Sequence, residues 1–198
     1  MDAQRNLYII AGPNGAGKTT ASFVLLPEYL GIREFVNADE IARGLSPFNP
    51  EAVAFEAGRI MLQRMNTLLE FGVSFAFETT LATRSYKGFV QKAQAQGYRC
   101  TLLFFALPNA EIAIGRVQQR VSEGGHNIPT DVIRRRYQRG LQNLFRYYWN
   151  VADELSLYDN SASMPLPVCQ KAGKSLILQH ALLYEYYNQK ATGSSSTL

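Results

Sequence analysis

One eight-residue segment near the N-terminus constrains this chain more than any other feature. Residues 12–19 read GPNGAGKT and match the pattern G-x-x-x-x-G-K-[ST] at every fixed position. Glycines at these places let the backbone curl so that successive N–H groups point at one anion, and the following helix adds its positive end. The lysine of this pattern reaches the β- and γ-phosphates, and the next hydroxyl can ligate Mg²⁺. The segment therefore predicts a P-loop that binds a nucleotide polyphosphate.

The residues around this loop support the same interpretation. The apolar run 7–11 predicts a buried strand leading into the loop, and residues 18–29 predict a helix leading out of it. We expect the nucleotide to be bound by the loop and the residue that follows it: Gly12, Pro13, Asn14, Gly15, Ala16, Gly17, Lys18, Thr19 and Thr20.

Short apolar runs alternate with amphipathic segments along the rest of the chain. Further strands are predicted at 35–37, 73–77, 100–107 and 155–158, and further helices from 51, at 85–97, 110–121, 131–150 and 175–189. Strands that alternate with helices form parallel βαβ units covered on both faces. The sequence thus predicts a single α/β P-loop NTPase domain over residues 1–191, with a mostly parallel sheet and a frayed tail at 192–198.

A second Gly-Lys-Ser sequence occurs at residues 173–175, after a stretch rich in serine and proline. The position of its first glycine is held by Val168, and no predicted strand leads into it. We interpret it as the start of the last helix and not as a second nucleotide site.

Composition excludes several classes of protein. The chain is 46% hydrophobic and 18% charged, which is typical of a globular domain. Its apolar runs fall well short of the ~20 residues that span a membrane, and residues 1–6 lack the apolar core of a secretion signal. Two cysteines make no disulfide framework and no Cys/His cluster suggests zinc. These features predict a cytoplasmic protein.

Positive charge is concentrated in residues 109–150, where seven arginines face three acidic residues, whereas the rest of the chain is balanced at 13 and 13. Such a field attracts phosphates. Two arginine-bearing helices are separated by a loop with two adjacent glycines at 124 and 125. His126 on this loop is interpreted as a solvated loop residue. We expect residues 116–136 to form a small lid that closes over nucleotide. Six arginines bracket this loop: Arg116, Arg120, Arg134, Arg135, Arg136 and Arg139. Two of them are expected to bind phosphates. The alternative is that all six belong to a solvated helical face.

Two carboxylates follow predicted strands. Asp39 comes just after the second strand and Glu78 at the end of the third. The carboxyl ends of parallel strands meet at one crevice, so both should face the P-loop. One is expected to deprotonate an acceptor hydroxyl and the other to bind substrate or the water shell of Mg²⁺ held by Thr19. The alternatives are a helix cap for Asp39 and a strand-end residue for Glu78.

Taken together, these residues resemble the zeta toxin family of P-loop kinases. The resemblance runs from about residue 7 to 160 and rests on GPNGAGKTT, FVNADEIARGLSP, FAFETTLA and RVxxRVxxGGHxIPxxxIxRRY. It implies a nucleotide-kinase-like fold with an arginine-bearing lid. It also implies roles for particular residues: Lys18 and Thr19 hold ATP and Mg²⁺, Asp39 is the base, and Arg43, Glu78 and Thr79 bind the acceptor. It further implies that Arg120 and Arg134 clamp phosphates, although the run of three arginines at 134–136 leaves open which of them is the second.

The same resemblance implies an activity and a partner. The family's best-known reaction is transfer of the ATP γ-phosphate to a sugar hydroxyl of UDP-N-acetylglucosamine, and its toxins are held inactive by a small antitoxin. This chain is shorter than many of these toxins, which leaves the acceptor open. The P-loop itself does not distinguish ATP from GTP.

Other readings of a P-loop chain predict different motifs. A transport-type ATPase would need a Leu-Ser-Gly-Gly loop, and a GTPase switch would need Asn/Thr-Lys-x-Asp; the sequence contains neither. A nucleic-acid end kinase would use the arginines on a phosphate backbone, but an interleaved aromatic and basic stripe for stacking bases is missing. A regulatory protein that only binds nucleotide would show no phosphotransfer.

Overall fold

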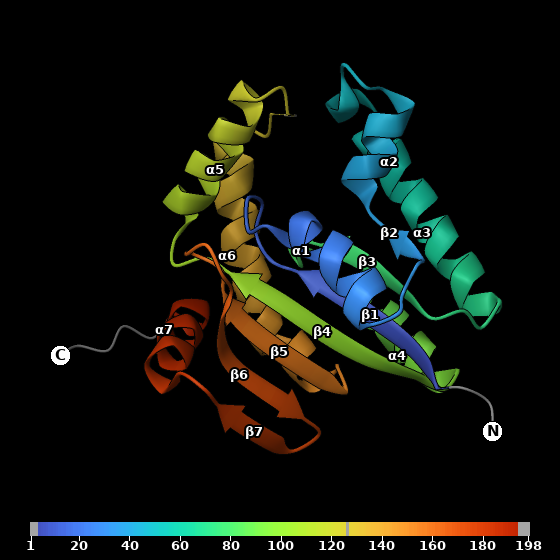
Figure 1. Cartoon of the computed structure of the whole chain (residues 1–198), viewed down its shortest axis with the longest axis vertical. Helices are drawn as coiled ribbons and strands as arrows, with labels where there is room; N and C mark the ends of the chain where they lie inside the picture. The colour runs from blue at the N-terminus through green and yellow to red at the C-terminus, as the bar shows by residue number, and fades with distance from the viewer. Residues whose placement is uncertain (1–3, 126, 194–198) are drawn as a thin grey trace.

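The computed structural model describes residues 4–125 and 127–193, and the described chain forms one seven-stranded sheet in the order β2-β3-β1-β4-β5-β6-β7 (Figure 1). The first five of these strands are parallel, whereas β6 and β7 are antiparallel to their neighbours. The mostly parallel α/β sheet predicted from the sequence is confirmed. The strands are β1 Arg5–Ala11, β2 Phe35–Val36, β3 Phe75–Thr79, β4 Tyr98–Ala106, β5 Glu154–Asp159, β6 Leu166–Ala172 and β7 Ser175–Leu178.

Helices cover both faces of the sheet, as Figure 1 shows. The α-helices are α1 Lys18–Val24, α2 Ala38–Leu45, α3 Ala54–Glu70, α4 Tyr86–Ala95, α5 Ala110–Ser122, α6 Thr130–Arg146 and α7 Ala181–Thr192. Shorter turns extend three of them: a π-helix at Leu25–Tyr29 after α1, and 3₁₀ turns at Pro50–Val53 before α3 and at Tyr148–Asn150 after α6.

Alternation along β1 divides the core into two layers. Leu7 and Ile9 point to one face, where they pack with residues of α3, α4, α6 and α7. Ile10 points to the other face, where it packs with residues of the π-helix, α5 and the first half of α6. Successive side chains of a strand point to opposite faces, so an all-apolar β1 must be buried on both. This burial fixes the P-loop, which directly follows β1, at the centre of the sheet's carboxyl edge.

The C-terminal region differs from the prediction. Residues 175–189 do not form one helix, because Ser175–Leu178 pairs with β6 and α7 begins only at Ala181. Ala172 faces Ser175 across a two-residue turn in which Gly173 has φ of 56°. A positive φ at the first turn residue suits a tight hairpin and favours glycine. Gly173-Lys174 is therefore a hairpin turn and not a helix start.

The predicted boundaries of the domain, the lid and the C-terminal tail stay predictions. Residues 194–198 of the expected tail, and His126 in the expected lid, lie outside the described residues, and α7 extends to Thr192. The arginine-bearing segment comprises the end of α5, the connecting loop and the start of α6. In the part of the chain that the structure describes, no helix combines the length and the apolar character needed to cross a membrane.

Candidate active site

The P-loop joins β1 to α1 in the conformation that its glycines allow. Gly12, Gly15 and Gly17 have φ of 143°, 74° and 75°. A Cβ on Gly12 would lie 2.2 Å from the carbonyl oxygen of Phe105 on β4. A side chain there is excluded by contact as well as by backbone conformation. Gly17 is the N-cap of α1, so the positive end of that helix opens on the loop.

The carboxylate of Glu78, near the end of β3, forms hydrogen bonds and an ion pair with the polar side chains beside the loop. The ammonium of Lys18 lies 3.4 Å from Glu78 Oε1, and the two side chains are only 6% and 9% exposed. The Thr19 hydroxyl donates to Glu78 Oε2 at 2.8 Å, and Asn37 Nδ2 donates to the same oxygen at 3.1 Å. Lys18 also donates to the carbonyl of Pro13 at 3.0 Å. Glu78 therefore contacts two residues of the P-loop, Lys18 and Thr19.

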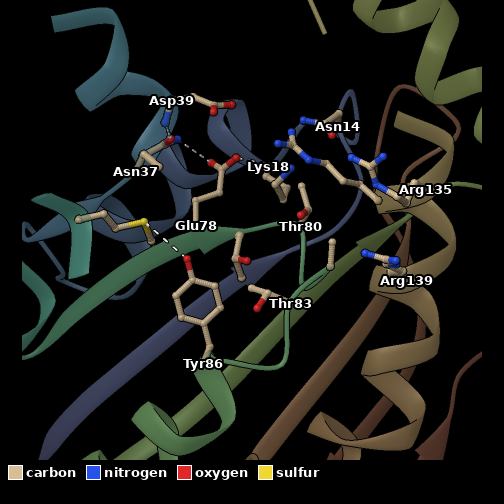
Figure 2. Close-up of a pocket in the computed structure, with 15 residues that line it drawn as sticks. Asn14, Lys18, Asn37, Asp39, Glu78, Thr80, Thr83, Tyr86, Arg135 and Arg139 are labelled. Atoms are coloured by element: carbon tan, nitrogen blue, oxygen red, sulfur yellow. Dashed lines mark hydrogen bonds and ion pairs between the residues drawn. The ribbon is translucent and has the colours of Figure 1, made fainter. Parts of the chain in front are cut away.

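Asn37 places Asp39 at the mouth of this site. Its side-chain oxygen accepts from the N–H groups of Asp39 and Glu40 at 2.8 and 3.4 Å, which makes Asn37 the N-cap of α2. The alternative reading of Asp39 as the helix cap is wrong, because Asn37 holds that position. The Asp39 carboxylate is left on the open side of the site, next to Asn37 and across from Lys18 (Figure 2).

Two cavities meet at Asp39. The first, of about 360 Å³, extends from Asn14 and Lys18 of the P-loop to Thr83 and Tyr86 (Figure 2). The second, of about 290 Å³, lies between α2 with the start of α3 and the end of α5 with the start of α6. Ala38, Asp39 and Arg136 line both. A carboxylate at the junction can therefore contact groups bound in either cavity.

The wall of the first cavity opposite Asp39 is built by α6, which approaches the loop after β3 very closely. A Cβ on Gly140 would lie 2.3 Å from the carbonyl oxygen of Thr80, so only glycine allows this packing. Asn143 on the next turn donates to the carbonyl of Leu81 at 2.7 Å. Leu81 has φ of 55°, a left-handed conformation that is costly for leucine. The neighbouring arginines of α6 thereby face the threonines: Arg135, Arg136 and Arg139 face Thr79, Thr80 and Thr83.

Tyr86 closes the far end of this cavity. Burial raises the pKa of its hydroxyl, and a hydrogen bond with Thr79 only partly offsets that effect. The hydroxyl is therefore protonated at neutral pH, and it lies 3.8 Å from Met61 Sδ. It supplies an aromatic face and a neutral donor and not a base.

The predicted arginines separate into different positions. Arg120 lines the second cavity, as does Arg43, whose guanidinium is 3.3 Å from Glu40. Arg134 instead forms a two-pronged ion pair with Glu111 on the exposed surface. The structure thus brings Arg120 to the site but does not bring Arg134 there, and Arg136 of the same triplet faces both cavities.

Known proteins share sequence and fold with this chain. The sequence model of the zeta toxin family, described as "Zeta toxin", matches residues 1–163. The chain belongs to the zeta toxin family. An uncharacterized protein of Haemophilus influenzae is 28% identical over 135 residues, which are 68% of this chain and 94% of that protein.

Solved structures resemble this zeta toxin family member over its whole length. The complex of AvrRxo1-ORF1 and ORF2 with ATP superposes with a TM-score of 0.74 at 19% identity, covering 100% of this chain and 66% of the other. A chain of the PezAT chromosomal toxin–antitoxin system of Streptococcus pneumoniae superposes with a TM-score of 0.66 at 17% identity, covering 99% and 82%. At these identities the likeness concerns the fold.

Sequence reasoning missed several residues of this family member's site. Asn37 was readable as a cap because it directly precedes Ala38, the first residue of a helix. Thr83 carried no signal, since its approach to α6 depends on how that helix packs against the loop after β3. Arg139 was among the six candidate arginines, and the same packing brings it to the first cavity. Asn160, which directly follows β5, was also missed. Its Nδ2 donates to the P-loop carbonyl of Ala16 at 2.7 Å.

Proposed function

We propose that this chain is a kinase that transfers the γ-phosphate of ATP to a hydroxyl group of a small acceptor. The observation that carries the proposal is the position of Asp39, a carboxylate at the junction of two cavities, beside a P-loop lysine. A nucleotide triphosphate on the loop would direct its γ-phosphate toward this junction. Family membership supports the same reaction class.

The nucleotide would be held by the parts of the loop already described. Backbone N–H groups and the positive end of α1 would attract the phosphates, and Lys18 would contact the β- and γ-phosphates. The ion pair of Lys18 with Glu78 would be exchanged for contacts with phosphate as nucleotide enters.

Magnesium fits the donors present at this position. Among the described residues no group of three His, Cys, Asp or Glu side chains could hold a metal by itself. Mg²⁺ is typically held by few protein groups together with phosphate oxygens and waters. The Thr19 hydroxyl would be its ligand, and Glu78, 2.8 Å from that hydroxyl, would accept from its waters. The ion would neutralise charge on the phosphates.

Asp39 is better suited than Glu78 to accept the proton of the acceptor. Glu78 already accepts hydrogen bonds from Thr19 and Asn37 and pairs with Lys18. Asp39 faces the open junction instead. In the reaction the acceptor oxygen bonds to the γ-phosphorus, the bond to the bridging oxygen of ADP breaks, and the hydroxyl proton moves to Asp39. Such general-base help contributes typically 10²–10⁴-fold.

The cavities support an acceptor that carries several polar groups. The first offers threonine hydroxyls and the ring of Tyr86, which suit a sugar, and its arginine wall suits phosphates. We propose a nucleotide sugar such as UDP-N-acetylglucosamine, with its reacting hydroxyl at Asp39 and contacts from Arg43, Glu78 and Thr79. Arg120 of the second cavity would clamp the transferring phosphoryl group.

The second clamping arginine is assigned differently from the sequence prediction. Arg134 is held by Glu111, whereas Arg136 lies at the junction beside Asp39. We propose that Arg136 takes this role. Because the solved relatives include toxin–antitoxin complexes, we also propose that a small antitoxin binds this chain.

The proposal is tested by incubating the protein with γ-labelled ATP, Mg²⁺ and a panel of nucleotide sugars, nucleosides and oligonucleotides. Label is expected on one small hydroxyl compound, and Asp39→Asn should abolish that transfer. Label found only as free phosphate would identify a P-loop ATPase instead. Label on oligonucleotide ends would identify a nucleic-acid end kinase.

A further inference from the structure

The turn that follows β5 braces the P-loop from behind. Asn160 Nδ2 donates to Ala16 O at 2.7 Å, and its backbone N–H donates to Ala106 O at the end of β4 at 2.9 Å. Arg116 of α5 donates to the carbonyls of Asn160 and Ser161, each at 2.8 Å, and to that of Gly15 at 3.4 Å. Two loop carbonyls are thus tied to one turn.

Little free space is left between the P-loop, the Asn160–Ser161 turn and α5. A Cβ on Gly17 would lie 2.8 Å from Asn160 Nδ2, and one on Gly15 would lie 2.9 Å from Ala113 O. A small shift of the Asn160–Ser161 turn would therefore be transmitted to the backbone that is proposed to hold the phosphates.

The conformation of this turn depends on Asp159, a buried carboxylate at the end of β5. Its Oδ1 accepts from the N–H and the hydroxyl of Ser161, the next residue but one. Its Oδ2 accepts from the hydroxyl of Tyr187, at 2.5 Å. Tyr187 lies on α7 and is fully buried. Burial, and then the hydrogen bond to Asp159, raise the pKa of Tyr187, so its hydroxyl stays protonated and donates.

The same helix is anchored to the end of β4. The Tyr186 hydroxyl and the Lys190 ammonium both donate to the carbonyl of Pro108 at 2.7 Å. Tyr137 of α6 also donates to this carbonyl, at 3.0 Å. α7 is therefore held across the ends of β4, which neighbours β1, and of β5, although it lies beyond residues 1–163, which match the family.

We propose that Asp159 is a positioning residue for the nucleotide, held in place by Tyr187, so that α7 sets the affinity of the P-loop. The path runs from the Tyr187 hydroxyl through Asp159 to the Asn160–Ser161 turn, and from there to the carbonyls of Gly15 and Ala16. The inference rests on the proposed use of the P-loop by a nucleotide, but not on any particular acceptor.

The test is a titration of the full chain with Mg·ATP, followed by calorimetry, in Tyr187→Phe and wild type. Loss of one hydrogen bond to a charged group should raise the Kd about tenfold at unchanged stoichiometry. A merely structural role would lower the melting temperature and the fraction of binding-competent protein without changing the Kd of the folded molecules. The KM for ATP should rise likewise, with kcat nearly unchanged.

The matched control is Tyr184→Phe on the same helix, since the ring of Tyr184 packs against Phe145 and Trp149 away from the P-loop. Its Kd for Mg·ATP should equal that of wild type. Asn160→Ala removes the bond to Ala16 directly but leaves the backbone carbonyls that Arg116 contacts, so in the double variant with Tyr187→Phe the Kd should rise by less than the product of the two single effects.

Two results would overturn the inference alone: a Kd for Tyr187→Phe within twofold of wild type, or multiplying effects in the double variant. Failure of the wild-type protein to bind Mg·ATP would overturn this inference and the proposed function together.

Discussion

The N-terminal region, residues 5–125, and the C-terminal region, residues 166–192, meet at the same carboxyl edge of the sheet but are specified in different ways. The first contains the motifs whose residues are proposed to carry the chemistry, with Lys18 after β1 and Asp39 after β2, on either side of β3. The second supplies no residue that lines the two cavities at Asp39, yet its Tyr187 reaches Asp159 behind the P-loop. The difference teaches that a site can be recognisable from one region while hydrogen bonds from another region hold the residues behind it.

Replacing the P-loop lysine should give the largest effect. Lys18→Ala removes the lysine that lines the first cavity and the cation that pairs with Glu78. Phosphotransfer should fall to background, more than about 10³-fold, because charge on the transferring group loses its main partner. The matched control is Lys174→Ala in the hairpin turn of the C-terminal region, which should leave the rate unchanged. Normal turnover by Lys18→Ala would remove the P-loop from the mechanism.

Replacing the proposed base should separate binding from chemistry. Asp39→Asn keeps the size of the side chain but cannot take up a proton, so the rate should fall by about 10³-fold while the Kd for Mg·ATP stays near that of wild type. Glu70→Gln, an exposed carboxylate at the end of α3, is the control. Rates are to be measured in single turnovers, and full transfer by Asp39→Asn would show that another group is the base.

Stability should differ between the two regions. Phe77 on β3 is fully buried, whereas Ile177 on β7 is 59% exposed. Phe77→Ala should lower the free energy of unfolding by about 3–5 kcal/mol, and Ile177→Ala should change it by less than about 0.5 kcal/mol. Urea unfolding followed by circular dichroism gives both values. A large loss for Ile177→Ala would mean that the hairpin's outer strand is covered in solution.

Each of the two regions contains one buried cysteine, and the pKa values of the two thiols make stability depend on pH. Burial raises the pKa of Cys100 on β4 to about 12 and that of Cys169 on β6 to about 11. A raised folded-state pKa stabilises the protein below the unfolded value near 9, and this contribution is lost as pH rises toward 11 and 12. Stability should therefore decline above about pH 9, measured by urea unfolding at several pH values; removing both thiols, as Cys100→Ala and Cys169→Ala, should reduce the decline.

Labelling rates should show the smallest difference. At pH 8 a thiol reagent should modify both cysteines slowly, with Cys169 reacting about tenfold faster, because a peripheral hairpin opens locally more often than a central strand. Mass spectrometry of each peptide measures the two rates. Equal rates would indicate that the hairpin and the central strands open together as one unit.

The fold was predictable from the sequence wherever the pattern of apolar residues and the glycine or proline residues at its ends indicated the same element. β1 and the P-loop are an example, since an apolar run ends at a glycine motif whose geometry is known. The hairpin was not predictable in this way, because Leu176-Ile177-Leu178 is a short apolar run that fits a helix or a strand equally well. Its strand conformation comes from pairing with β6, which no local signal reveals.

The site was predictable to the level of strand ends but not of helix faces. Asp39 and Glu78 follow neighbouring strands, so topology alone brings them to the P-loop. The run Arg134-Arg135-Arg136 is different, since successive residues of a helix point about 100° apart. Which of them faces the site depends on the close packing of Gly140 against Thr80, and that contact is a property of the folded chain.

The most direct test of the account is a phosphorus NMR measurement on the wild-type chain with Mg·ATP and UDP-N-acetylglucosamine. The account predicts that ADP and a new phosphomonoester signal on the sugar appear in equal amounts, and that both are missing with Asp39→Asn. Consumption of ATP that yields only ADP and inorganic phosphate, with this and every other hydroxyl acceptor of the panel, would contradict it.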